Sequence, residues 1–185
     1  MNTPPELWTI GHSTRSFAEF LEMLHAQRIQ VLVDVRRYPM SRRHPQFNAE
    51  ALQQTLKGIG LEYRPMAGLG GRRSPQPDSP NVGWRNASFR GYADYMQTEP
   101  FRLALASLSS IASQARTAVM CAEAVPWRCH RSLIADAMTS QGWRVLHILA
   151  KDKVDAHSLC AFARIDDGRV TYPRSEESDP ESRLF

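Results

Sequence analysis

The residues best able to do chemistry lie together in residues 117–131, TAVMCAEAVPWRCHR. This segment begins with the apolar pattern of a buried strand, and apolar residues return at helical spacing after it. Between the two lie Cys121, Glu123, Cys129 and His130. In an open α/β sheet, ligands bind at the carboxyl ends of strands, where the following helix offers free N–H groups. We therefore expect a functional site between this strand and this helix.

Cys121 is the candidate nucleophile. A thiolate at the end of a strand would be stabilised by Arg128, by Arg131 and by the next helix N-terminus, and these lower the pKa of a cysteine. Phosphatases of the Cys-x5-Arg type and rhodaneses share this order of strand, cysteine, anion-binding loop and arginine. The interval from Cys121 to Arg128 is one residue longer, however, and the loop has no glycine. The alternative is that Cys121 is an inert buried residue, because free cysteine is among the most buried residue types.

Glu123, His130 and His12 are the candidate acids and bases. Glu123 could be a general base or could orient the arginines, since ion-pair networks perturb carboxylates as catalysis does. His12 follows the first apolar run, where it could exchange a proton, donate to an anion, or simply bond to the backbone of a turn. A zinc site is a further alternative, although the chain has no CxxC spacing. We predict no cofactor; if a metal is present, we expect Cys121, Cys129 and His130 to bind it.

Arginine supplies most of the positive charge, and it is clustered. The net charge is +4, and only three of the 23 basic residues are lysine. The arginines gather in three segments that follow expected strands, and the planar guanidinium group suits phosphate and carboxylate. The residues expected to bind an anionic group are Arg36, Arg42, Gly70, Gly71, Arg72, Cys129 and Arg131.

The order of apolar patterns predicts an α/β fold. Near-continuous β-branched runs are typical of strands that are covered on both faces of a parallel sheet. We expect strands at residues 7–10, 29–35, 61–63, 117–120 and 145–149, with helices between them. The expected architecture has three layers, a mainly parallel central sheet with helices on both faces, and a C-terminal β-hairpin around Asp166, Asp167 and Gly168. Residues 1–172 would form one domain, and residues 173–185 a solvated tail.

Local signals refine this arrangement. Ser16 and Glu19 have the spacing of a capping box at a helix start, and Asn48 is expected to cap the next helix. Asp34 lies within an apolar strand, where a buried carboxylate needs a partner, and Arg36 lies on the same side of the strand. Residues 66–88 are rich in Gly, Pro, Ser and Asn, which is typical of a lid over a substrate.

Composition narrows the class of protein. The apolar and charged fractions, 42% and 23%, are those of a globular protein, and no stretch approaches the roughly 20 apolar residues of a membrane span. The first residues, MNTPPELW, lack a basic flank followed by an apolar region, so we expect a cytoplasmic location and no membrane partner. Three cysteines suit reduced thiols better than a disulfide framework.

Four segments together resemble the family known as domain of unknown function 488. They are TIGHS at 9–13, LVDVRRYPMSRRHPQF at 32–47, LGGRR at 69–73 and MCAEAVPWRCHRSLIA at 120–135. The resemblance implies no established reaction. It does imply signature residues at His12, Asp34, Arg36, Pro39, Ser41, Arg42, Gly70, Gly71, Cys121, Glu123, Cys129, His130 and Arg131. A weaker resemblance to the rhodanese-like fold, through VDVR after one strand, concerns architecture alone.

The leading functional prediction is an enzyme, a thiol-dependent or acid/base-dependent transferase or hydrolase. Its partner would be an anionic small molecule, phosphate-like or nucleotide-like, held in a pocket of Arg, Cys, His and Glu. One alternative is a nucleic-acid-binding module whose arginine loops contact phosphates while Trp84, Phe89 or Tyr92 stacks on bases. Another is a Cys/His metal-binding protein. The sequence indicates no particular oligomeric state.

Overall fold

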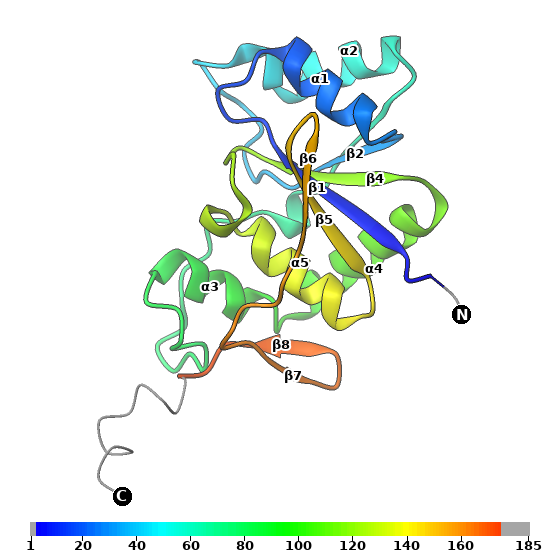
Figure 1. Ribbon diagram of the computed structural model, residues 1–185. Helices are drawn as coiled ribbons and strands as arrows, with labels where there is room; N and C mark the ends of the chain where they lie inside the picture. Colours follow the sequence, from blue (N-terminus) through cyan, green and yellow to red (C-terminus); the bar gives the residue numbers. More distant parts are fainter. Residues whose placement is uncertain (1–2, 175–185) are drawn as a thin grey trace, which may run out of the picture.

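Residues 3–174, which the computed structural model describes, contain a central sheet of six strands in the order β3-β2-β4-β1-β5-β6 (Figure 1). Five strands are parallel, and β6 runs antiparallel to β5 at one edge. The strands are β1 (Glu6–Gly11), β2 (Val31–Asp34), β3 (Glu62–Pro65), β4 (Thr117–Cys121), β5 (Arg144–Ala150) and β6 (Lys153–Ala156). The carboxyl ends of β1, β2 and β4 therefore lie side by side.

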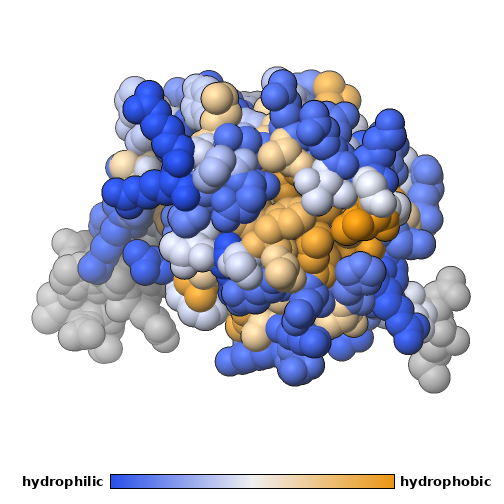
Figure 2. All heavy atoms as spheres, turned by 90° about the horizontal axis from the view of Figure 1, so that it is seen from above, coloured by the Kyte–Doolittle hydropathy of each residue, from blue (hydrophilic) through white to orange (hydrophobic). Residues whose placement is uncertain are grey.

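Helices cover both faces of this sheet (Figure 1). On one face lie α1 (Phe17–Ala26) and α2 (Ala49–Gly58), and on the other lie α3 (Ala87–Tyr95), α4 (Glu99–Gln114) and α5 (Arg131–Ser140). Alternate residues of β2 divide between the layers: Leu32 packs with Phe20 of α1, whereas Val33 packs with Leu105 of α4. Figure 2 shows the α1 and α2 side, where apolar atoms gather inside a rim of hydrophilic side chains. The predicted three-layer α/β fold is confirmed.

The hairpin that follows the sheet is confirmed in part of its predicted range. It consists of β7 (Arg164–Asp166) and β8 (Arg169–Thr171), which pair antiparallel. Asp167 and Gly168 have φ angles of 47° and 72°, so both take the left-handed conformation that a tight two-residue hairpin turn requires. The sequence favours a first strand at residues 160–165, whereas β7 covers only Arg164–Asp166. The edge strand β6 was not predicted, because three of its four residues are exposed and carry no apolar pattern.

The two predicted helix caps differ in outcome. Ser16 Oγ accepts a hydrogen bond from Glu19 N at 3.1 Å, so the cap of α1 is confirmed. Asn48 precedes α2 but does not cap it with its side chain; its Oδ1 instead accepts from Ser41 N at 2.6 Å. That bond closes the loop between β2 and α2, and therefore serves the site rather than the helix. The sequence favours a helical turn at residues 92–96, and most of that turn belongs to the longer α3.

The segment 66–88 is anchored to α3. The buried carboxylate of Asp94 accepts from Gln76 N at 2.8 Å, from Ser79 Oγ at 2.6 Å and from Asn81 Nδ2 at 2.8 Å. The Tyr92 hydroxyl donates to a backbone carbonyl of the short η2 (Ala67–Leu69). These bonds order the segment without regular structure. Its closing over a substrate stays a prediction.

The C-terminal boundary is described only in part. Val170 and Tyr172 are buried in the core, which brings β8 into the same packing as α5. The end of a single domain at residue 172 stays a prediction, and most of the predicted tail, 173–185, lies outside the described residues. Within residues 3–174, no helix combines the length and the apolar character needed to cross a membrane.

Candidate active site

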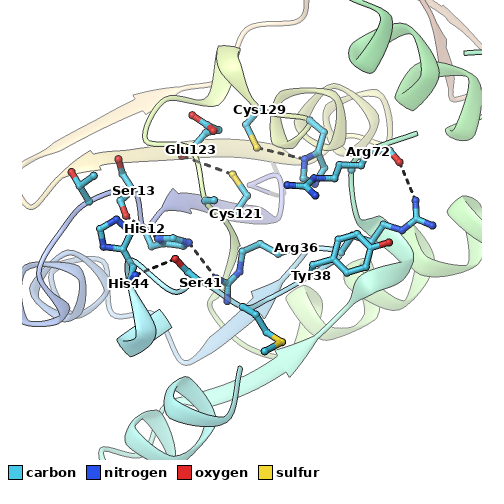
Figure 3. Close-up of a pocket in the computed structure, with 16 residues that line it drawn as sticks. His12, Ser13, Arg36, Tyr38, Ser41, His44, Arg72, Cys121, Glu123 and Cys129 are labelled. Atoms are coloured by element: carbon cyan, nitrogen blue, oxygen red, sulfur yellow. Dashed lines mark hydrogen bonds between the residues drawn. The ribbon is translucent and has the colours of Figure 1, made fainter. Parts of the chain in front are cut away.

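A pocket of about 460 Å³ lies at the carboxyl edge of the sheet (Figure 3). It is built from the loops that follow β1, β2, β3 and β4, as expected for an open α/β sheet. Eight of the predicted site residues line it: His12, Arg36, Gly71, Arg72, Cys121, Glu123, Cys129 and His130. The structure therefore brings together the segments that the sequence separates by up to about a hundred positions.

Three other predicted residues lie near the pocket without lining it. Arg42 is exposed on the loop after β2 and is not among the residues that line the pocket. Gly70 is buried, and a Cβ there would lie 2.9 Å from the Arg37 Cβ atom, so its role is close packing. Arg131 is fully buried behind the pocket. Arg128, which was considered with Cys121, lines a smaller neighbouring pocket instead.

Several lining residues were not among the predicted site residues. They come mainly from the loop between β2 and α2, and include Arg37, Tyr38, Met40 and His44. Tyr38 and Met40 are 62% and 82% exposed. Large exposed apolar side chains in a loop already rich in arginine were the available signal, but sequence alone does not show that they are exposed.

The buried ion pair predicted between Asp34 and Arg36 is confirmed. Arg36 Nη2 lies 2.6 Å from Asp34 Oδ2, and Arg36 Nε also donates to the carboxylate. The Tyr63 hydroxyl donates to the same Oδ2 at 2.7 Å, and burial together with the Asp34 charge raises the pKa of Tyr63. Arg36 is thus held at the end of β2 with one edge of its guanidinium group directed along the pocket wall (Figure 3).

His12 is held as a neutral ring against this arginine. Its Nε2 lies 3.2 Å from Arg36 Nη1, and its Nδ1 lies 3.0 Å from the Ser13 carbonyl oxygen. Because a guanidinium group only donates, Nε2 must accept and Nδ1 must carry the proton. Burial lowers the pKa of His12 to about 4, and its ring stacks on Phe47 at 4.4 Å. His12 therefore accepts a hydrogen bond from Arg36 and helps to position it.

Two buried thiols face each other in the pocket (Figure 3). Burial acts to raise the pKa of Cys121, but a hydrogen bond from Cys129 and the charge of Arg131 outweigh it, and the pKa is lowered. The pKa of Cys129 is raised well above its usual value by its bond to Cys121 and by burial. These opposite shifts favour the thiolate form of Cys121 over that of Cys129.

Arg131 supplies a buried positive charge behind these thiols. Its Nη2 donates to the Ala124 carbonyl oxygen at 3.2 Å. Within residues 3–174, its Nε and Nη1 have no hydrogen-bond partner, and no carboxylate pairs with it. A buried charge needs compensation, and this charge acts on Cys121, whose pKa it lowers.

The floor of the pocket is formed by main chain. The backbone N–H groups of His12 and Ser13 donate to the carbonyl oxygens of Cys121 and Ala122, at 3.0 and 2.8 Å. These bonds extend the pairing of β1 and β4 past the end of the sheet. A Cβ atom on Gly11 would lie 1.7 Å from the Glu123 carbonyl oxygen, so only glycine allows this approach.

The side chain of His130 lies inside the pocket, whereas that of Glu123 lies at the pocket mouth. The His130 ring packs against Gly71, its Nδ1 lies 3.6 Å from Cys129 Sγ, and burial lowers its pKa to about 4. Glu123 is exposed at the mouth of the pocket, and none of the ion pairs among residues 3–174 includes it. His130 is thus a neutral base beside a thiol, and Glu123 is the carboxylate open to an incoming molecule.

The rim is positively charged. The guanidinium carbons of Arg37 and Arg72 lie 5.7 and 5.8 Å from the centre of the Tyr38 ring, and Arg37 Nη1 donates to the Arg72 carbonyl oxygen at 2.9 Å. Neither arginine pairs with a carboxylate in the part of the chain that the structure describes. Both charges are therefore available to an anion at the entrance.

Other predicted contacts are not supported by the geometry. The described residues contain no group of three or more His, Cys, Asp or Glu side chains placed to hold a metal ion, so Cys121, Cys129 and His130 do not form one. Tyr92 is fully buried and cannot stack on a base. Trp84 and Phe89 stack on each other at 4.8 Å and pack against the core.

A second buried network, which the sequence did not reveal, lies on the α5 side of the sheet. The Asp136 carboxylate accepts from His157 Nε2 at 2.8 Å and from the Tyr172 hydroxyl at 2.7 Å. His157 Nδ1 lies 2.9 Å from His147 Nε2, and His147 Nδ1 lies 2.7 Å from Thr9 Oγ1. Burial, with the neighbouring His157 and Arg131 charges, lowers the pKa of His147 to about 3. The residues of this network come from β1, β5 and α5 and from the positions just after β6 and β8, and they have no common spacing in the sequence.

Acid will destabilise the protein through its three neutral histidines, His12, His130 and His147. Their folded-state pKa values, about 4, 4 and 3, lie below the unfolded value of 6.5. The unfolded chain therefore binds more protons below about pH 6.5, and stability present above that pH is lost as pH falls. We expect the loss in the free energy of unfolding from about pH 7 to pH 5 to be about 3 kcal/mol. Urea unfolding at both pH values measures it.

The matched variant is His130→Asn, which removes one of the three groups. Its stability should vary less with pH over the same interval than that of the parent chain. A free energy of unfolding that is equal at the two pH values in the parent chain would contradict the neutral state of these rings.

The comparison with known proteins gives the family. Residues 16–138 match the family described as Domain of unknown function DUF488. The chain belongs to this family. The predicted resemblance is thereby confirmed, and the matched part of this DUF488 protein includes both pocket cysteines, whereas His12 precedes it. Neither a curated protein nor a solved structure matches the chain.

Proposed function

We propose that this DUF488 protein is a thiol-dependent transferase or hydrolase that acts on an anionic substrate, with Cys121 as the nucleophile. The observation that carries the proposal is Arg131, a fully buried guanidinium group without a carboxylate partner among residues 3–174, placed beside that thiol. Such a charge is costly unless an anion compensates it. A thiolate is the reactive form of cysteine, so the same feature supports nucleophilic chemistry.

The charge of the entrance supports an anionic substrate. Arg36 lines the wall, and Arg37 and Arg72 lie at the rim with no carboxylate partners in the described part of the chain. Guanidinium groups bind phosphate oxygens in pairs of parallel hydrogen bonds. The exposed Tyr38 ring between them offers a flat surface for a planar group, which favours a phosphate-bearing or nucleotide-like molecule.

The remaining side chains suit supporting roles. Glu123 lies at the mouth, where a carboxylate can accept a proton from an attacking water or alcohol. His130 is neutral beside Cys129, and His12 fixes Arg36 in place. The proposal thus assigns proton transfer to Glu123 or His130 and substrate orientation to the arginines.

Alkylation by iodoacetamide tests both the thiolate and the anion site. Cys121 is expected to react at about pH 7 at least about tenfold faster than Cys160, because the pKa of Cys121 is lowered and burial raises that of Cys160. Inorganic phosphate should slow the reaction at Cys121 alone. Peptide mass spectrometry measures each cysteine in the same sample, so Cys160 is an internal control.

Two outcomes would contradict the proposal. One is a Cys121 that reacts no faster than Cys160; the other is a Cys121 rate that phosphate leaves unchanged.

Turnover of any anionic chromogenic ester should disappear in Cys121→Ser and persist in Cys160→Ser, because Cys160 lies outside this pocket.

A further inference from the structure

We propose that Cys121 and Cys129 form a two-thiol couple that reduces small anionic disulfides, with Cys129 as the resolving thiol. The inference rests on the proposed nucleophile Cys121. It goes further by naming a class of substrate and a second catalytic thiol. Neither cysteine is paired in a disulfide in the structure.

The fold brings the two sulfur atoms into one cavity. Cys121 is the last residue of β4, and Cys129 follows the short η3 (Pro126–Arg128) just before α5. The intervening loop folds back, so that both side chains line the same pocket with 1% and 5% of their surfaces exposed (Figure 3). The candidate nucleophile thus shares its cavity with a second thiol.

The surroundings of the two thiols give them different roles. Cys121 has the lowered pKa and attacks first, whereas Cys129 remains protonated. Once Cys121 is bonded to substrate sulfur, its negative charge is gone, and the main cause of the raised pKa of Cys129 is removed. The Arg131 backbone N–H already points at Cys129 Sγ at 3.5 Å, and His130 Nδ1 lies 3.6 Å from the same sulfur. These groups can stabilise a second thiolate and accept its proton.

The reaction balances as two exchanges. Cys121 thiolate attacks one sulfur of R–S–S–R; the substrate S–S bond breaks, and R–S⁻ leaves to take a proton from water. Cys129 then passes its proton to His130 and attacks the Cys121 sulfur, and the second R–S⁻ leaves with that proton. The substrate gains two electrons, and the protein holds a Cys121–Cys129 disulfide. An external dithiol reductant restores both thiols.

The charge of the pocket selects the substrate. The charges of Arg37 and Arg72 lie at the entrance without carboxylate partners among residues 3–174, and Glu123 is the carboxylate among the lining residues. A disulfide that carries carboxylates is attracted to this entrance, and one that carries ammonium groups is repelled. The attraction should weaken as salt is added.

The test uses the full chain with Cys160→Ser, which leaves only the proposed pair. DTNB, a disulfide with two carboxylates, should release two equivalents of thionitrobenzoate per chain and leave no adduct by intact mass. Adding Cys129→Ser should give one equivalent and a stable adduct on Cys121. The first measurement leaves the pair intact, so the proposal does not depend on the folding of the Cys129 variant.

A comparison of two alkyl disulfides tests the substrate class. Dithiodipropionate is anionic and cystamine is cationic, and both lack the activated leaving group of DTNB. The anionic compound is expected to oxidise the pair at least about tenfold faster at low salt, a ratio that salt should reduce. Equal rates would overturn the assignment of an anionic disulfide.

A persistent adduct on Cys121 in the Cys160→Ser chain would overturn the role of Cys129. That failure is separable from failure of the proposed function. If iodoacetamide still reacts rapidly at Cys121 and phosphate protects it, the nucleophile stands and only the two-thiol couple falls. If both results are negative, the nucleophile itself is wrong.

Discussion

Replacing Arg131 by methionine is expected to slow the alkylation of Cys121 at about pH 7 by about tenfold or more, with no loss of thermal stability. The guanidinium group is fully buried and lowers the pKa of Cys121. Its removal raises that pKa, and each unit is a tenfold change in the ratio of thiolate to thiol. Methionine fills a similar volume, and replacing a buried charge by an apolar side chain is often neutral or stabilising. Iodoacetamide kinetics and thermal unfolding measure the two effects.

Arg128→Met is the matched control for this change. Arg128 is exposed and lies three positions before Arg131, but its side chain lines a neighbouring pocket. Both the rate at Cys121 and the thermal stability should stay close to those of the parent chain. If Arg131→Met instead unfolds the protein while alkylation of the remaining native fraction is unchanged, Arg131 has a structural role and the central argument for a thiolate fails.

Replacing Asp34 by alanine should lower the free energy of unfolding by about 3–5 kcal/mol. Asp34 is almost fully buried and accepts hydrogen bonds from the Arg36 side chain, from the Arg36 backbone N–H and from Tyr63. Its loss would leave the buried Arg36 guanidinium group without a counter-charge and the partly buried Tyr63 hydroxyl without its acceptor. Urea unfolding at neutral pH measures the difference.

Glu62→Ala provides the control from the neighbouring strand. Glu62 also pairs with an arginine two residues away, Arg64, at 2.6 Å, but both side chains are about half exposed. Exposed pairs contribute only about 0–1 kcal/mol. Adding Arg36→Met to Asp34→Ala should restore part of the lost stability, because it removes the unpaired charge. If Asp34→Ala and Glu62→Ala lowered the free energy of unfolding by the same small amount, the buried ion pair would not be a major contribution to stability.

Most strands of the sheet could be predicted from the sequence, because a strand that is buried on both faces consists mainly of apolar residues. The run from Ile29 to Val35 is apolar except for Gln30 and Asp34, and the strand lies in the interior with helices on both faces. The edge strand β6 has one partly buried residue, so no apolar pattern identifies it. Asn48 is a common N-cap residue, but its side chain accepts a hydrogen bond from the Ser41 backbone N–H instead of capping α2.

The site was predictable in location because strand ends can be located from the sequence. Cys121, Arg36 and His12 each follow an apolar run, and parallel strands bring such ends to one edge. The depth of a side chain could not be predicted in this way. Arg131 and Arg42 are both arginines in segments next to the site, yet one is buried behind the thiols and the other is exposed to solvent. Only tertiary packing distinguishes them.

The close approach of β1 to the loop after β4 limits how this site can be changed by mutation. Gly11 and the backbone bonds from His12 and Ser13 make the floor out of main chain, which side-chain substitution cannot reshape without breaking the fold. The rim, by contrast, consists of side chains such as Tyr38 and Met40 that have few contacts to lose. Substitutions at the rim, engineered or acquired in evolution, can therefore change which substrates bind. The nucleophile and the backbone around it would remain unchanged.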